Sequence, residues 1–223
     1  MASMSLPLFP LGLVLYPGVV LPLHIFEPRY RRLVQELLDM PDGSRLFGVV
    51  AIKAGREVGV HGVTALHEIG CTAELRYAEA YEDGRFDIIA TGTDRFRLIE
   101  VDDADLMRAE VELLPELTSA ETESAAVRVR RLFGTYRQAL QTAQGLPVDV
   151  DPLELPDDPG ELAYLVAASM ILDLTDKQVL LGAATVDERL RLERDLLKRE
   201  ASMVSGLSMR PAVELPRMPY TAN

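Results

Sequence analysis

The most constraining feature of this sequence is a change of pattern near residue 116. Ten of the fifteen glycines lie before residue 117, between short runs rich in β-branched and aromatic residues. Beyond that point the apolar residues recur with helical spacing. Many short strands favour a barrel-like sheet, and the later stretches favour a helical bundle. We therefore predict an α+β fold with a β-barrel subdomain over residues 1–116, a helical subdomain over 117–207 and a flexible tail over 208–223.

Local signals place the strands and one early helix. Asp83 and Gly84 separate two apolar runs, and Asp-Gly suits a tight hairpin because both residues tolerate positive φ. Pro28 suits a first helical turn, so we predict a helix from there to about Met40. The predicted strands are Leu6–Leu8, Leu13–Tyr16, Val20–His24, Leu46–Ile52, Cys71–Tyr81, Arg85–Thr93, Arg95–Val101 and Met107–Leu114.

Helix starts in the later part are marked by capping boxes, in which a side-chain oxygen accepts from free backbone N–H groups and a Glu or Gln reaches back. The pairs are Thr118 with Glu121, Asp158 with Glu161, Thr175 with Gln178, and Thr185 with Glu188. The first of these helices also carries one apolar stripe, which should face the other helices or the sheet. Its members are Val129, Leu132, Phe133, Tyr136, Leu140 and Ala143.

Charge and composition exclude several classes of protein. The 35 acidic and 23 basic residues give a net charge of −12, with no stripe of Lys and Arg, so we predict no nucleic-acid partner. The only cysteine, Cys71, excludes an intrachain disulfide and favours a reducing compartment, the cytoplasm. The start of the chain is a poor signal peptide, and prolines and glycines break the apolar run Leu11–Ile25, so we predict no membrane span.

Catalytic motifs are weak or missing. None of the three lysines follows a glycine, which excludes a Walker-type nucleotide loop. The string His67–Cys71 mimics a zinc-protease helix, but Cys71 replaces the second His, so a strand entry is favoured over a metal site even with His61 nearby. His24 and Cys71 would pair as base and nucleophile only if the fold brought them together. We predict that the protein is not an enzyme and has no metal or cofactor.

Two polar segments have ordinary interpretations. Asp102–Asp105 is typical of a solvated turn rather than an acid–base pair, because charge runs usually lie in water. In Gly92–Arg97, arginines alternate with apolar residues, which favours a half-exposed strand over an anion site.

The segment Leu6–Tyr30 is apolar and rich in proline. Prolines remove ladder donors, so part of it must be edge or loop, and a rigid apolar edge can receive a flexible peptide. The candidate binding residues are Tyr16, Phe26, Glu27, Arg29 and Tyr30. For the three aromatic residues, peptide binding and covering the barrel are equally open. Glu27 and Arg29 have a second interpretation, as structural partners that hold the turn at Pro28.

The same segment resembles the opening of the Lon protease N-terminal domain family. The motifs that carry this resemblance are Leu6-Pro-Leu-Phe-Pro-Leu11, Tyr16-Pro-Gly18, Leu21-Pro-Leu23 and Phe26-Glu-Pro-Arg-Tyr30. Further motifs are Phe47-Gly-Val-Val50, Gly55-Arg-Glu-Val-Gly59, His67-Glu-Ile-Gly70, Gly92-x-x-Arg-Phe-Arg97 and Ala109-Glu-Val111. Leu162–Ser169, Leu174–Leu181 and Val186–Leu190 look like the family's helical subdomain, so the resemblance covers about residues 5–204.

The resemblance implies a PUA-like β-barrel followed by a helical bundle, which in Lon helps to capture damaged or unfolded protein. Lon continues into ATPase and protease domains with a Ser–Lys dyad, whereas this sequence stops at Asn223, so we expect a free-standing binding module without chemistry. Unfolded or partner proteins are the expected ligands, and the oligomeric state is open. The alternatives are RNA binding through the PUA-like fold and a hydrolase of the Lon peptidase type.

Overall fold

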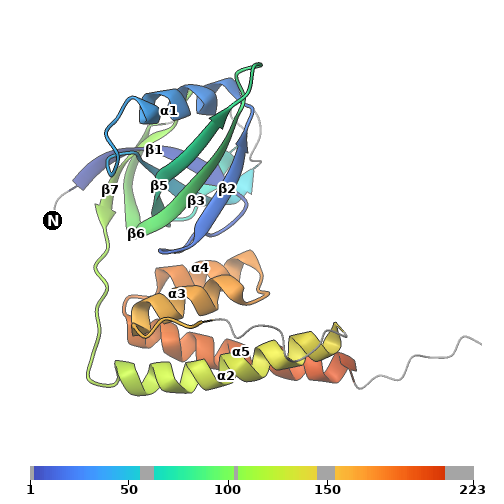
Figure 1. The fold of residues 1–223 in the computed structure, drawn as a ribbon. Helices are drawn as coiled ribbons and strands as arrows, with labels where there is room; N and C mark the ends of the chain where they lie inside the picture. Colours follow the sequence, from blue (N-terminus) through green and yellow to red (C-terminus); the bar gives the residue numbers. More distant parts are fainter. Residues whose placement is uncertain (1–2, 56–62, 103–104, 145–153, 209–223) are drawn as a thin grey trace, which may run out of the picture.

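The computed structural model describes residues 3–55, 63–102, 105–144 and 154–208. In these residues a β-rich part is followed by a helical part, with one extended segment leading from the first to the second (Figure 1). The strands are β1 (Ser3–Leu11), β2 (Val20–Ile25), β3 (Leu46–Gly55), β4 (Val63–Leu66), β5 (Ile69–Ala80), β6 (Phe86–Asp102) and β7 (Arg108–Leu113). The helices are α1 (Pro28–Leu38), α2 (Thr122–Ala143), α3 (Pro159–Ser169), α4 (Leu174–Gly182) and α5 (Val186–Ser208).

Strand β1 closes the sheet into a barrel. Its residues 3–7 pair antiparallel with β7, its residues 8–11 pair parallel with β3, and β6 and β5 complete the ring. The change of partner explains how β1 contains both Pro7 and Pro10. Pro7 pairs only with β7 and Pro10 only with β3. Each proline therefore lies at a position with a neighbouring strand on one side, where the lack of an N–H is tolerated. Strand β2 pairs with β6 outside the ring.

The predicted strand Leu13–Tyr16 is wrong, because residues 12–19 form a loop between β1 and β2. Leu15 packs into the core of the barrel, whereas Tyr16 packs among the helices. The alternation in the sequence therefore reflects burial in two different cores rather than strand pairing. Elsewhere, the two strands predicted on either side of Asp94 are the single strand β6, and β4 was not predicted.

The predicted hairpin and early helix are both present. Strands β5 and β6 are joined by a turn in which Gly84 has a φ of +78°. Helix α1 begins at Pro28, ends at Leu38 and lies across one end of the barrel (Figure 1). It packs four apolar side chains against the barrel core, namely Tyr30, Leu33, Val34 and Leu37.

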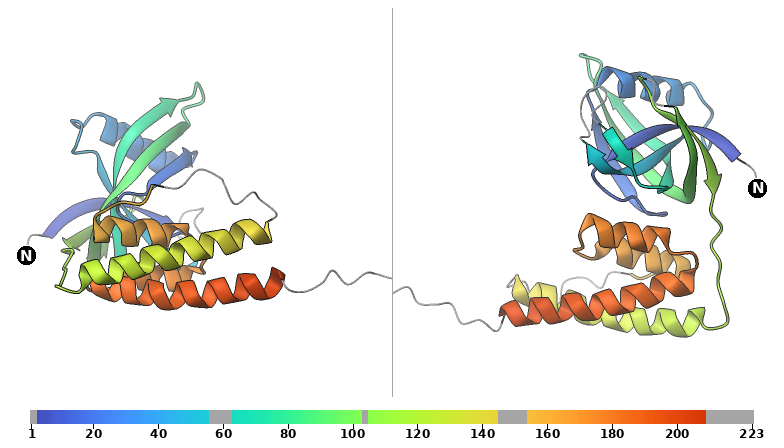
Figure 2. Two further views of the ribbon diagram at one scale, coloured as in Figure 1. Left: turned by 60° about the horizontal axis from the view of Figure 1, so that its bottom comes forward. Right: turned by 180° about the vertical axis from the view of Figure 1, so that it is seen from behind.

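The helical part has two layers. Helices α3 and α4 lie between the barrel and the longer α2–α5 pair in both directions of view (Figures 1 and 2). The predicted stripe of α2 faces this interior: Val129, Phe133 and Tyr136 are buried in the helical core, with Leu132 and Leu140 partly buried beside them. Among the described residues, no helix is long and apolar enough to cross a membrane.

Two of the four predicted caps are confirmed. The Asp158 carboxylate accepts from the Glu161 N–H at 2.9 Å, and the Thr185 hydroxyl accepts from the Glu188 N–H at 3.1 Å. Helix α4 is capped by Asp173 rather than by Thr175. Helix α2 begins at Thr122 rather than after Thr118, and its N-cap residue makes no side-chain cap.

The Thr185 cap leads to a stability prediction. We expect Thr185→Ala to lower the free energy of unfolding by about 1 kcal/mol, because the first turn of α5 loses an acceptor for its N–H groups. Thr118→Ala is the matched control, since Thr118 caps no helix. Urea unfolding of both variants checks this, and equal stability of the two would contradict it.

The last strand and the first helix of the helical part lie on either side of the boundary predicted at residue 116. Strand β7 ends at Leu113, α2 begins at Thr122 and α5 reaches Ser208, so the secondary structure changes type across the boundary predicted at 116. Division into separately folding subdomains stays a prediction. The predicted tail, apart from Ser208, lies outside the described residues.

Candidate functional site

Three neighbouring strands bring exposed apolar side chains together on the outside of the barrel. The register pairs Tyr77 of β5 with Ile89 of β6, and Ile89 with Pro22 of β2, so these side chains form one row across the sheet. Val20 lies two residues before Pro22 on the same strand and is 59% exposed; Tyr77 is 54% and Ile89 41% exposed. We call the outward surface of β2, β6 and β5 between Val20 and the β5–β6 turn the outer face.

A shallow hollow of about 410 Å³ lies in the outer face. Its lining comes from all three strands, namely Pro22, Leu23, His24, Tyr77, Glu79, Asp87, Ile88 and Ile89. Aromatic side chains continue the apolar surface at one end. Phe26 is 49% exposed, and the His24 ring lies 6.5 Å from the Phe26 ring and 6.1 Å from the Tyr81 ring.

A polar row crosses the outer face beside the apolar one, because Glu79 is in register with Asp87, and Asp87 with His24. The Tyr81 hydroxyl donates to Asp87 Oδ2 at 2.5 Å, and His24 Nδ1 lies 2.5 Å from Asp87 Oδ1. These two hydrogen bonds lower the pKa of the Asp87 carboxyl, and the one from Tyr81 has the larger effect. Asp87 is therefore held as a carboxylate with both oxygens in use.

Burial removes Tyr16 from any exposed site. It lies in the helical core, and its hydroxyl donates to the Lys177 carbonyl at 2.8 Å. Gly92 lets the Tyr16 backbone come close to β6, because a Cβ on residue 92 would lie 2.2 Å from the Tyr16 carbonyl oxygen. Tyr16 therefore joins the loop before β2 to the helices, and of its two open interpretations this burial favours a structural role.

The other four predicted residues lie together around the start of α1. Only Phe26 is well exposed. Tyr30 is buried and stacks on Phe9 with ring centroids 3.9 Å apart. Arg29 Nη2 donates to Glu27 Oε2 at 3.0 Å, with both side chains largely buried, as expected for partners that hold the Pro28 turn. Of the predicted set, Phe26 alone extends the outer face.

A buried ionic cluster joins the barrel to the helices. Arg95 of β6 and Arg189 of α5 are both buried, and both donate to the Glu116 carboxylate, at 2.5 Å and 3.1 Å. The Tyr164 hydroxyl donates to the same carboxylate. Arg95 also donates to the carbonyls of Leu181 and Ala183 at the C-terminal end of α4. The sequence predicts a half-exposed Arg95, which is wrong because its pairing partners follow it far along the chain.

A fully buried carboxyl adjoins this cluster, whose own Glu116 carboxylate is about one third exposed. Glu193 of α5 is completely buried, and neither of its oxygens has a hydrogen-bond partner among the described residues. Burial raises the pKa of Glu193 well above its usual range, and the nearby Arg189 guanidinium offsets this only in part. The pKa of Tyr16 is also raised, mainly by burial and secondly by the negative charge of Glu193 when that group is ionised.

The buried Glu193 predicts a pH dependence of stability. Its native pKa is raised, so the native state keeps the proton above about pH 4.3, where the unfolded chain releases it. The contribution of Glu193 to the free energy of unfolding is therefore largest below that pH. It decreases as the pH rises toward the native pKa. We expect Glu193→Gln to match wild type near pH 4 and to become progressively more stable than wild type toward pH 8.

Urea unfolding across this pH range measures the difference. Glu123→Gln, which removes an exposed carboxylate from α2, is the control and should leave the pH profile unchanged. Parallel profiles for wild type and Glu193→Gln would show that Glu193 ionises normally in the folded protein.

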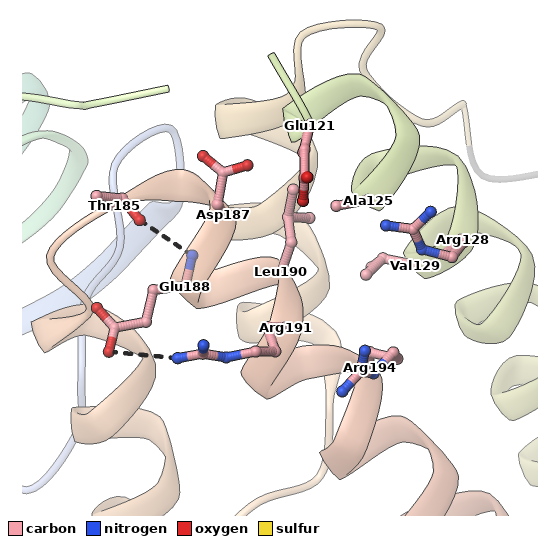
Figure 3. A pocket seen from close by; sticks show the side chains of 10 residues that line it. All are labelled: Glu121, Ala125, Arg128, Val129, Thr185, Asp187, Glu188, Leu190, Arg191 and Arg194. Carbon is pink, nitrogen blue, oxygen red and sulfur yellow. Dashed lines mark hydrogen bonds and ion pairs between the residues drawn. The ribbon is translucent and has the colours of Figure 1, made fainter. Parts of the chain in front are cut away.

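Two further hollows belong to the helical part and its junction with the barrel. A cleft of about 760 Å³ lies between the loop 17–19 and α3, and Glu116 and Tyr164 of the ionic cluster line it. A smaller hollow of about 290 Å³ lies between α2 and the start of α5 (Figure 3). Its Asp187 accepts from Ser119 and Thr122, so this carboxylate holds the two helix starts together. The larger cleft is lined by apolar residues such as Val19 and Leu165 as well as by acidic ones, whereas the smaller hollow is lined mostly by charged side chains.

The groups considered for catalysis do not meet. Cys71 is fully buried, and burial raises the pKa of its thiol, whereas His24 is exposed on the outer face. His67 precedes β5. Its pKa is lowered mainly by burial and, to a smaller extent, by the positive charge of Lys53. In the described part of the chain, no three His, Cys, Asp or Glu side chains are placed to hold a metal, and His61 lies outside that part.

Comparison with known proteins agrees with the sequence resemblance. Lon protease 2 of Syntrophobacter fumaroxidans is 32% identical over 176 residues, which cover 76% of this chain and 21% of that protein. The Lon protease of Escherichia coli strain K12 is 27% identical over 90% of this chain and 25% of its own length. The chain thus spans about a fifth to a quarter of the length of these relatives.

Solved structures share the fold. A Lon N-terminal domain protein from Xanthomonas campestris matches with a TM-score of 0.61 at 25% identity, over 87% of this chain and 98% of that chain. The N-terminal domain of the Mycobacterium avium complex Lon protease matches with a TM-score of 0.65 and the same coverages, and at 18% identity it shows the fold alone. The predicted α+β fold, a PUA-like barrel followed by a helical bundle, is confirmed.

The family model for the ATP-dependent protease La (LON) substrate-binding domain matches residues 5–199. By its description, this family is the substrate-binding domain of that protease. Because this match covers most of the sequence, the chain belongs to the LON substrate-binding domain family.

Proposed function

We propose that this chain binds extended, apolar segments of unfolded or partner proteins on its outer face, without chemistry of its own. The observation that carries the proposal is the exposed row of Tyr77, Ile89 and Pro22 across three paired strands, continued by Val20 and Phe26. Contiguous exposed apolar surface on a folded protein commonly marks an interaction site. The sheet already holds these side chains in place, so the protein loses little conformational entropy when a client binds.

The edge of the sheet suits an extended client. Within the described residues β2 pairs with β6 alone, so its other edge has backbone groups available to a further strand. Strand addition supplies main-chain hydrogen bonds that do not depend on client sequence, and neighbouring apolar side chains add contact area. Pro22 reduces the number of donors on this strand, which limits uncontrolled pairing between copies.

Family membership supports a role in selecting proteins for quality control, because the matched domain is described as substrate-binding. Whether the chain acts alone or with a protease is part of the proposal. The predicted cytoplasmic location accords with a single buried thiol. RNA binding is the second candidate, but the outer face carries Glu79 and Asp87 rather than a basic stripe.

Isothermal titration with a reduced, permanently unfolded model protein tests the proposal, with the same protein in its native form as the control. We expect binding of the unfolded form only, with no cleavage of it on prolonged incubation. A parallel titration with single-stranded RNA at low salt should give no heat. If the unfolded protein does not bind, the capture hypothesis fails and a dedicated folded partner becomes the better one.

A further inference from the structure

The polar row of the outer face contains two carboxylates directly opposite each other. Glu79 of β5 and Asp87 of β6 are register partners, and like charges at such positions destabilise a sheet. His24 on β2 forms a hydrogen bond with Asp87 from the other side. Within the described chain, the Glu79 carboxylate has neither an ion pair nor a hydrogen bond. This pair therefore leaves negative charge on the outer face that the fold itself does not neutralise.

The nearest cationic side chains are already engaged. Arg85 pairs with Asp83 at 2.7 Å in the β5–β6 turn, and Arg76 pairs with Glu74 at 2.9 Å. The protein as a whole carries a net charge of −12, so its long-range field attracts cations. Neither guanidinium group is therefore paired with Glu79, and its exposed carboxylate is accessible to a cationic side chain of a client.

The spacing of the two rows relates this charge to the apolar anchors. Tyr77 and Glu79 are two residues apart on β5, as are Ile89 and Asp87 on β6. Same-face side chains at this spacing in a strand lie roughly 6.8 Å apart. An extended client that lies over the outer face and runs along the strands, rather than beside the edge of β2, has the same repeat. Its side chains at positions i and i+2 would then lie over the apolar row and the acidic row.

The geometry points to a specific client class: extended segments in which a Lys or Arg lies two positions from an aromatic or branched apolar residue. This selectivity rests on the proposed function, since it concerns the same face. The apolar row supplies contact area, and the Glu79–Asp87 row selects the basic side chain. Segments with an acidic residue at that position are rejected by like charge.

Fluorescence anisotropy with labelled peptides of one composition tests the spacing on the full chain. One peptide carries Lys two positions after its aromatic anchors, a second carries the same Lys one position after them, and a third replaces Lys with Glu at the first spacing. We expect the first peptide to bind about fivefold more tightly than the third at low salt, with the difference shrinking at high salt. The second should lose much of the advantage, because its Lys points to the opposite face.

Protein variants assign the effect to the row. Glu79→Gln should reduce the preference for the first peptide, whereas Glu110→Gln, which neutralises an exposed carboxylate on β7, should not. If both variants behave alike, or if Lys position has no effect, the net charge of the protein explains the attraction and this inference is overturned. Equal binding of the Lys and Glu peptides would overturn the selectivity but leave apolar capture standing. Failure of all three peptides and of the unfolded protein would remove the proposed function itself.

Discussion

Replacing Arg189 with methionine is expected to lower the free energy of unfolding by about 3 kcal/mol. The Arg189 side chain is fully buried, and it donates to Glu116 and to the Leu180 carbonyl. Its guanidinium also lies 4.2 Å from the centre of the Tyr164 ring. Methionine fills a similar volume but satisfies none of these acceptors, and it removes the cation that lies near the buried Glu193.

Arg191→Met on the same helix is the matched control, because the Arg191 side chain is 63% exposed and its ion pair with Glu188 is long, at 3.8 Å. Its effect should stay within about 0.5 kcal/mol. Urea unfolding near neutral pH compares the two variants. If Arg189→Met is as stable as Arg191→Met, apolar packing alone holds the barrel to the helices.

Truncating Tyr77 and Ile89 together to alanine is expected to weaken binding of an unfolded client about thirtyfold, equivalent to about 2 kcal/mol. Both side chains are central to the outer face and more than a third exposed, so their removal deletes contact area with little loss of core packing. Phe26→Ala should weaken binding less, because Phe26 lies at one end of that surface.

Val127→Ala is the control for this pair, since Val127 is an exposed apolar residue on α2, away from the barrel. Calorimetry on variants with unchanged thermal melts separates binding from folding. Tyr30→Ala, in contrast, is expected to lower stability, because Tyr30 stacks on Phe9 inside the barrel core. Unchanged affinity of the double variant would place the client site elsewhere.

The features that the sequence determined by itself are those set by nearby residues. The start of α1 at Pro28 and the caps at Asp158 and Thr185 were predictable, because a cap depends on groups within one helical turn. The buried stripe of α2 was predictable for the same reason, since helical spacing relates residues three and four apart. Similar short signals at Thr118 and Thr175 misplaced two helix starts: Asp173 caps α4 instead, and α2 begins at Thr122 without a side-chain cap from its N-cap residue.

Only the tertiary structure decided which polar and aromatic side chains are exposed. The sequence leaves Tyr16 and Tyr30 open between peptide binding and packing, and the structure buries one among the helices and the other in the barrel. Arg95 looks half-exposed, yet it meets Glu116 and the end of α4. The outer face depends on the pairing of β2 with β6, which joins residues more than 60 positions apart, as well as on the local β5–β6 hairpin. Such pairings follow from closure of the barrel and docking of the helices, and no local periodicity encodes them.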